Sequence, residues 1–220
     1  MDTIQDYLNS GAKDVAPLLS LTLGKNQAQL IAYNDHCLSN EEKSKINKLI
    51  SQREKGVPFA YISGTKGFYH LEFKVTPDTL IPRPETELLI DIALDLFNQH
   101  QNPKIIDLGT GSGIIAITLA DKNPKWNITA TDYSQSALNV AKQNTTTAIN
   151  FQKGSWFDAV PNKTFDLIVS NPPYIKENDP YLSDLTYEPI TALTSGKDGL
   201  DDIRIIIDNA PKYLNKDGYI

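Results

Sequence analysis

An apolar stretch that runs into a glycine-rich turn and then into a helical pattern constrains the fold of this chain most. Residues 104–108 read Lys-Ile-Ile-Asp-Leu, glycines follow at positions 109, 111 and 113, and residues 114–120 are again mostly apolar. Glycine lets the backbone turn sharply and approach a ligand closely, while the N-terminus of the next helix offers unpaired N–H groups. The order of strand, glycine turn and helix predicts an α/β fold that binds a ligand at this turn.

Three more short apolar stretches predict further strands of a parallel sheet, at residues 126–131, 149–152 and 165–170. The second strand ends in Asp132, where an acid can accept both hydroxyls of a ribose. The alternative is that Asp132 caps the helix that follows it. Trp156, in the loop after the third strand, either flanks an adenine ring or packs in the core, and spacing does not decide between them.

The fourth strand ends in the unusual sequence Asn171-Pro172-Pro173-Tyr174. Each proline fixes its own φ and pushes the preceding residue into extended geometry, so the carbonyls here stay out of any helix. They form a rigid set of acceptors at the carboxyl end of a strand, which is where α/β sheets bind ligands. The simpler alternative is that the prolines only terminate the strand.

The chain divides into three parts by pattern. Residues 1–58 are helical in spacing, with a capping sequence at Ser39 and Glu42, and form either a stabilising appendage or a docking surface. Residues 59–80 alternate as a β-hairpin linker, and residues 81–220 carry the sheet. A helix is expected over 200–214 and a strand from Gly218, so we expect this chain to lack further C-terminal strands that would complete the sheet.

Composition excludes several classes of protein. A formal net charge of −6 argues against a protein that grips nucleic acid through its phosphates. A single cysteine, Cys37, excludes an intrachain disulfide, and the scattered histidines show no metal-ligand spacing, so no metal is expected. The sequence shows neither a signal peptide nor a membrane-spanning segment, and we expect a monomeric cytoplasmic protein.

The same motifs resemble a known family. The order of elements is similar to that of the Rossmann-like class I methyltransferases, which use S-adenosylmethionine, and Asn-Pro-Pro-Tyr is typical of those that methylate a planar nitrogen. Residues 56–62, 67–69, 80–87, 107–113 and 171–174 look like the HemK/PrmC family of release-factor glutamine methyltransferases. The resemblance covers nearly the whole chain and implies a methyltransferase domain at 81–220.

The resemblance implies transfer of a methyl group from S-adenosylmethionine to the side-chain nitrogen N5 of the glutamine in the Gly-Gly-Gln loop of peptide chain release factors, leaving S-adenosylhomocysteine. Two alternatives are an amino-methyltransferase for a flipped nucleic-acid base and a non-catalytic cofactor-binding module. Ser155 stands where family members often have an acid before the tryptophan, which puts the contact with the adenine amino group in question. The implied cofactor-binding residues are Asp107, Gly109, Thr110, Gly111, Ser112, Gly113, Asp132, Trp156 and Asn171; the implied substrate-binding residues are Asn171, Pro172, Pro173, Tyr174 and Arg83, with Asn171, Pro172 and Tyr174 catalytic.

Overall fold

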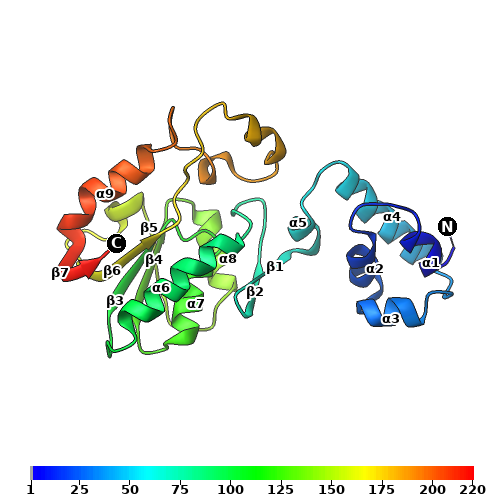
Figure 1. Ribbon diagram of the computed structural model, residues 1–220, viewed down its shortest axis with the longest axis horizontal. Coiled ribbons are helices and arrows are strands. Elements are labelled where there is room, and N and C mark those ends of the chain that lie inside the picture. Colours follow the sequence, from blue (N-terminus) through cyan, green and yellow to red (C-terminus); the bar gives the residue numbers. More distant parts are fainter. Residues whose placement is uncertain (1) are drawn as a thin grey trace. The chain divides into compact units, whose positions relative to one another are not determined.

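The computed structural model describes residues 2–220 and divides them into two compact units (Figure 1). The first unit ends at Gly64 and the second begins at Thr65. The first unit has one buried apolar cluster and the second has two, so each unit is described by itself.

The first unit is helical, as its three-to-four spacing predicts, and comprises α1 (Ile4–Leu8), α2 (Val15–Leu23), α3 (Gln27–Ala32), α4 (Asn40–Glu54) and α5 (Phe59–Ser63). The predicted capping box forms at the start of α4: Glu42 N donates to Ser39 Oγ at 3.2 Å, and Ser39 N donates to Glu42 Oε2 at 2.8 Å. The core of the unit consists of Ile4, Tyr7, Leu18, Leu19, Leu30, Leu38, Ile46 and Ile50.

The prediction that the β-hairpin linker begins at residue 59 was wrong. Residues 59–63 form helix α5 and do not belong to the hairpin. Phe59 and Ile62 pack against the core of the first unit, and Gly64 ends the helix with a φ of 78°. The aromatic and β-branched composition that suggested a strand is therefore overridden by the packing of these two side chains.

The second unit opens with an antiparallel hairpin of β1 (Thr65–Phe68) and β2 (Leu71–Lys74), which presents Phe68 and Phe73 to a core shared with helix α6 (Glu87–Phe97). A five-stranded parallel sheet follows in the order β5-β4-β3-β6-β7. The strands are β3 (Lys104–Leu108), β4 (Asn127–Asp132), β5 (Asn150–Lys153), β6 (Phe165–Ser170) and β7 (Leu214–Tyr219). The parallel α/β sheet predicted from the sequence is confirmed.

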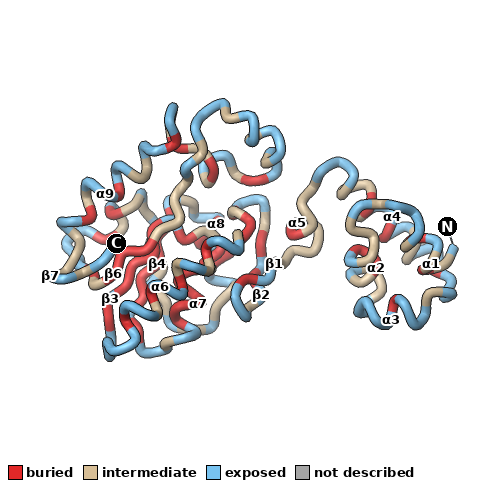
Figure 2. The backbone as a smooth tube through the Cα atoms, viewed as in Figure 1, coloured by how far each residue is buried: buried red, intermediate tan, exposed pale blue. Residues whose placement is uncertain are grey.

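Alternate residues of the sheet face two different apolar clusters. Ile105 and Leu167 join the cluster formed with α6 and α7 (Ile114–Lys122), whereas Ile106 and Ile168 join the cluster formed with α9 (Asp201–Tyr213). Helix α8 (Gln135–Gln143) connects β4 to β5. Figure 2 shows that burial is concentrated along β3, β4 and β6, in the middle of the sheet. The result is a sheet covered on both faces, as expected of parallel strands.

The last strand differs from the expectation. β7 begins at Leu214, directly after α9, and not at Gly218. Leu214 is aligned with Phe165 and Tyr219 with Leu167, and the register shifts between these pairs. This irregularity explains why residues 215–217 carry no clear strand pattern. The predicted additional strands concern residues outside this sequence and stay a prediction.

Candidate active site

A cavity of about 310 Å³ lies at the carboxyl ends of the central strands. The chain runs from β3 to β4 and β5 on one side and returns through β6 on the other, so the order of the strands, all of them parallel, reverses between β3 and β6. Such a reversal leaves a crevice where α/β proteins bind ligands. The lining residues are Pro77 to Leu80, Pro82, Gly109 to Ser112, Ile114, Ile115, Asp132 to Ser134, Ala137, Gly154 to Trp156, Asn171 to Pro173, Pro189, Thr191, Ala192 and Asp202.

The glycine turn forms one wall of the cavity. Gly109 has a φ of 71°, and a Cβ there would lie 3.3 Å from Cζ3 of Trp156. Gly113, at the start of α7, has a φ of 88°, and a Cβ would lie 2.5 Å from Cδ1 of Ile117. Both positions therefore favour glycine, mainly because of their left-handed backbone conformation.

The Asp107 side chain forms hydrogen bonds with this turn and with the helix that follows it. It is fully buried, and its Oδ2 accepts hydrogen bonds from Thr110 Oγ1 at 2.6 Å and from Ala116 N at 3.3 Å. Within residues 2–220 its other oxygen, Oδ1, has no hydrogen-bond partner. Burial raises the pKa of Asp107 to about 7, against the opposing effect of the two hydrogen bonds. Asp107 and Gly113 are not among the lining residues, and their role in cofactor binding stays a prediction.

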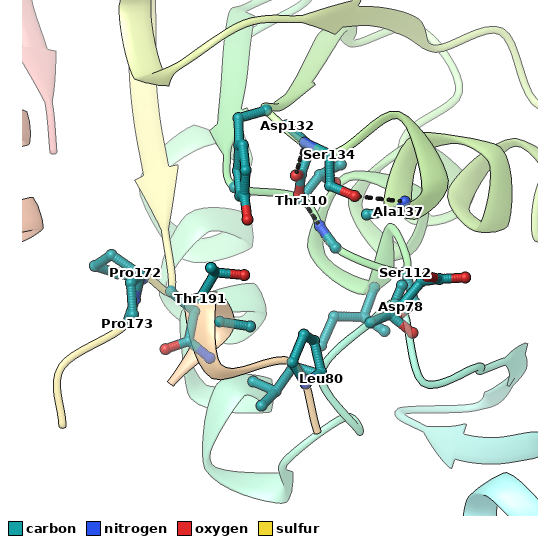
Figure 3. Close-up of a pocket in the computed structure, with 18 of the residues that line it drawn as sticks. Asp78, Leu80, Thr110, Ser112, Asp132, Ser134, Ala137, Pro172, Pro173 and Thr191 are labelled. Atoms are coloured by element: carbon teal, nitrogen blue, oxygen red, sulfur yellow. Dashed lines mark hydrogen bonds between the residues drawn. The ribbon is translucent and has the colours of Figure 1, made fainter. Parts of the chain in front are cut away.

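Asp132 lies in the cavity wall at the end of β4. Its Oδ2 accepts from Gly111 N at 2.9 Å, and its Oδ1 accepts from Ser134 N at 2.8 Å (Figure 3). Burial raises its pKa, and backbone hydrogen bonds partly offset the rise. The cap of α8 is Ser134, whose Oγ accepts from Ala137 N at 3.2 Å. The alternative that Asp132 caps the helix is therefore wrong, because Ser134 holds that position, while the contact of Asp132 with a ribose stays a prediction.

Trp156 lines the same cavity and also packs against the core cluster around α9. It has a φ of 46°, which is unusual for a bulky residue, and its Nε1 donates to Asp202 Oδ1 at 3.2 Å. The packing predicted as one alternative is therefore confirmed, and the same side chain also reaches the cavity, while its contact with an adenine ring stays a prediction. Asp202 was not predicted from the sequence, because it lies in the first turn of α9, far along the chain from Trp156.

The Asn-Pro-Pro segment closes the other side of the cavity. Figure 3 shows Pro172 and Pro173 on one side, with Asp78 and Ser112 on the opposite side. Asn171 Nδ2 donates to Oγ1 of the buried Thr86 at 3.2 Å. In this arrangement the amide nitrogen is used as a donor and Oδ1 is available to accept.

Two residues predicted to bind substrate lie outside the lining set. Tyr174 is 61 % exposed, beside the prolines. Arg83 pairs with Glu188, with 2.5 Å between Nη2 and Oε1. Glu188 itself is buried and is not predicted by the sequence, since nothing in its neighbourhood indicates a partner 105 residues away.

The described residues limit the chemistry further. Among residues 2–220, no group of three or more His, Cys, Asp or Glu side chains is arranged to hold a metal ion. No helix within the same range is both long and apolar enough to cross a membrane. Three carboxylates, those of Asp78, Asp132 and Asp202, line the cavity instead, which suits a ligand with hydroxyl donors and a positive charge.

A parallel sheet with its cavity at this reversal, bounded by a glycine turn and an acid at the end of the second strand, defines a Rossmann-like methyltransferase fold. Two solved structures share it. The hMettl16 catalytic domain in complex with MAT2A 3'UTR hairpin 1 matches with a TM-score of 0.55 at 18% identity, over 97% of this chain and 79% of that one. An S-adenosylmethionine-dependent methyltransferase from Agrobacterium tumefaciens matches with a TM-score of 0.51 at 15% identity, over 70% of this chain and 49% of that one.

Sequence comparison gives the family. Residues 86–195 match the family described as Methyltransferase small domain, and residues 5–64 match the PrmC N-terminal domain. The release factor glutamine methyltransferase of Coxiella burnetii is 43% identical over 211 residues, covering 94% of this chain and 76% of that protein. That of Vibrio cholerae is 42% identical over 223 residues, covering 98% and 78%. The chain belongs to the release factor glutamine methyltransferase family.

Proposed function

We propose that this protein transfers a methyl group from S-adenosylmethionine to the side-chain nitrogen N5 of the glutamine in the Gly-Gly-Gln loop of peptide chain release factors, in the cytoplasm. The observation that carries the proposal is the position of Asn171 and Pro172, which line the same cavity as Asp132 and Trp156. Family membership supports the release factor as substrate. The opposing sides of one cavity thus offer a cofactor-binding wall and an acceptor for a planar nitrogen.

The cavity residues fit the cofactor. The Asp132 carboxylate supports binding of the two ribose hydroxyls, and the flat indole of Trp156, held by Asp202, supports stacking with adenine. The acidic lining favours a cationic ligand over a neutral one. The cofactor supplies a methyl group activated by its sulfonium.

The protein's task is then to orient a weak nucleophile. An amide nitrogen is unreactive because its lone pair is delocalised into the carbonyl. If Asn171 Oδ1 and the Pro172 carbonyl each accept one N–H of the glutamine amide, that nitrogen is held with its remaining face toward the cavity. The hydrogen bond from Asn171 Nδ2 to Thr86 supports this role, since it leaves Oδ1 available to accept.

Little proton transfer by the protein is needed in this scheme. On transfer the S–CH3 bond would break as the N–CH3 bond forms, the sulfur would keep the bonding electron pair, and the methylated amide nitrogen, which is strongly acidic, would release one N–H proton to solvent. Alignment and fixed dipoles then supply most of the acceleration. Pro173 keeps the segment rigid, and the exposure of Tyr174 supports a contact with the incoming protein. No general base among the histidines is required.

The proposal predicts that Asn171→Ala lowers kcat by about 10²-fold or more, because one of the two amide acceptors is lost. Methyl transfer is measured with radiolabelled S-adenosylmethionine and purified release factor, with a release factor whose Gly-Gly-Gln glutamine is replaced by glutamate as the substrate control. Asn139→Ala is the matched protein control, because Asn139 is an exposed asparagine on α8. Label on the glutamate variant, label on nucleic acid instead of protein, or normal turnover by Asn171→Ala would each contradict the proposal.

A further inference from the structure

Glu188 is a buried carboxylate that joins two distant parts of the second unit. Its side chain is only 3% exposed. Oε2 accepts from Ile81 N at 2.9 Å, and Oε1 accepts from Arg83 Nη2 at 2.5 Å. Both oxygens therefore have a donor, as a buried carboxylate requires.

The residues on either side of these contacts belong to the cavity. On one side, Pro77 to Leu80 and Pro82 line it, next to Ile81 and Arg83. On the other side, Pro189 follows Glu188 directly and leads into the short helix η4 (Ile190–Ala192), where Thr191 and Ala192 line the cavity. The carboxylate of Glu188 is thus a direct connection between two walls of one cavity that are about a hundred residues apart in sequence.

Prolines make this connection stiff. Pro82 and Pro84 flank Arg83, and Pro189 follows Glu188, so the backbone at each contact has few alternatives. Breaking the contacts would leave the N–H of the buried Ile81 without its partner and the two walls free to separate.

We propose that Glu188 is a positioning residue that sets the distance between the two cavity walls, and that Arg83 acts through Glu188 and not by touching the substrate. This inference rests on the proposed function for its catalytic consequences. It assigns Arg83 a different role from the substrate contact that its place in the sequence suggested. Affinity for the cofactor and for its product should therefore depend on a residue that does not line the cavity.

A double-mutant cycle tests the proposal. Glu188→Gln, Arg83→Met and the double variant are compared in the full chain, with the dissociation constant for S-adenosylhomocysteine measured by titration calorimetry. Each single variant should weaken binding by about tenfold, as expected for a lost charge-assisted hydrogen bond at a rigid wall. The double variant should bind no more weakly than the weaker single variant, because both changes break one connection.

The same variants separate positioning from substrate contact. If Arg83 touches the release factor, Arg83→Met raises KM for release factor and leaves S-adenosylhomocysteine binding unchanged. The effects of Arg83→Met and Glu188→Gln then multiply in the double variant. This result overturns the proposal. Arg204→Met is the matched control, since it removes an exposed pair with Asp198 in the same unit, and it should change binding by less than about twofold.

Two further measurements keep the outcome unambiguous. Arg83→Lys retains the charge, so this variant should bind S-adenosylhomocysteine with an affinity between those of the wild type and Arg83→Met. If circular dichroism shows that Arg83→Met is unfolded, Arg83→Lys takes its place in the cycle. Absence of release-factor methylation by the wild type would refute the proposed function, whereas unchanged S-adenosylhomocysteine affinity in folded Glu188→Gln would refute the role of Glu188.

Discussion

Replacing Asp107 by asparagine should remove a pH-dependent cost from the folding of the second unit. Asp107 is fully buried at the end of β3, and its pKa rises from the usual 3.8 to about 7 because burial disfavours the charged form. The folded state therefore binds a proton more tightly than the unfolded state does. The stability that this proton contributes is complete below pH 3.8 and is lost as pH rises toward 7.

The size of the effect follows from the shift. A change of about 3 pKa units at about 1.36 kcal/mol each gives a total of about 4 kcal/mol, of which about 3 kcal/mol falls between pH 4.5 and pH 8. Asparagine has the same shape and does not titrate. As pH rises from 4.5 to 8, the free energy of unfolding of Asp107→Asn should therefore increase by about 3 kcal/mol relative to that of the wild type.

The assay is urea unfolding followed by tryptophan fluorescence. Trp126 and Trp156 are the two tryptophans of the sequence, and both belong to the second unit, so the signal reports the unit that contains Asp107. Comparing differences at the two pH values cancels the hydrogen bonds that asparagine makes differently from aspartate, because these do not change with pH. Other titrating groups occur in both proteins and cancel to first order.

Parallel pH profiles for Asp107→Asn and the wild type would refute the reasoning. Such a result would mean that Asp107 is ionised in the folded protein over the whole range, and that its partners Thr110 and Ala116 offset the burial completely. A profile with the opposite slope would mean that the folded state lowers the pKa of Asp107.

Two other substitutions test connections within each unit. Asn144 accepts a hydrogen bond from Lys74 N at 2.7 Å and donates to Lys74 O at 3.0 Å and to Ser112 O at 2.9 Å. Asn144→Leu should therefore detach the hairpin from the glycine turn and raise the dissociation constant for S-adenosylhomocysteine by about tenfold. Unchanged affinity in calorimetry would count against this prediction. Ser39→Ala removes the side-chain acceptor for Glu42 N and should lower the free energy of unfolding of the first unit by about 1 kcal/mol, measured by urea unfolding followed by far-ultraviolet circular dichroism; a loss below about 0.3 kcal/mol would show that the cap contributes little.

Features that depend on short stretches were predictable from the sequence. The strand at 165–170 was predicted with the bounds that β6 has, and the capping box of Ser39 and Glu42 was readable from their spacing. Helix α5 was missed because its helical state depends on packing against the first unit's core. The start of β7 was missed because its register with β6 is irregular.

Features that depend on distant partners were not predictable in the same way. Trp156 and Asp202 are 46 residues apart, Asn171 and Thr86 are 85 apart, and Arg83 lies 105 residues from Glu188. No local periodicity encodes such pairs, since each forms only after the sheet has brought separate loops together. The sequence therefore predicted several residues that line the cavity, such as Asp132, Trp156 and Asn171, but not the distant partners that hold them in place.

Ligand binding in the cavity provides a measure of the thermodynamic coupling between the two units. All of its lining residues come from the second unit. A ligand that binds there stabilises the folded second unit directly, by about 2.7 kcal/mol when its free concentration is a hundred times its dissociation constant. The first unit gains from that ligand only through thermodynamic coupling between the units, so any ligand-induced rise in the first unit's own melting temperature measures that coupling.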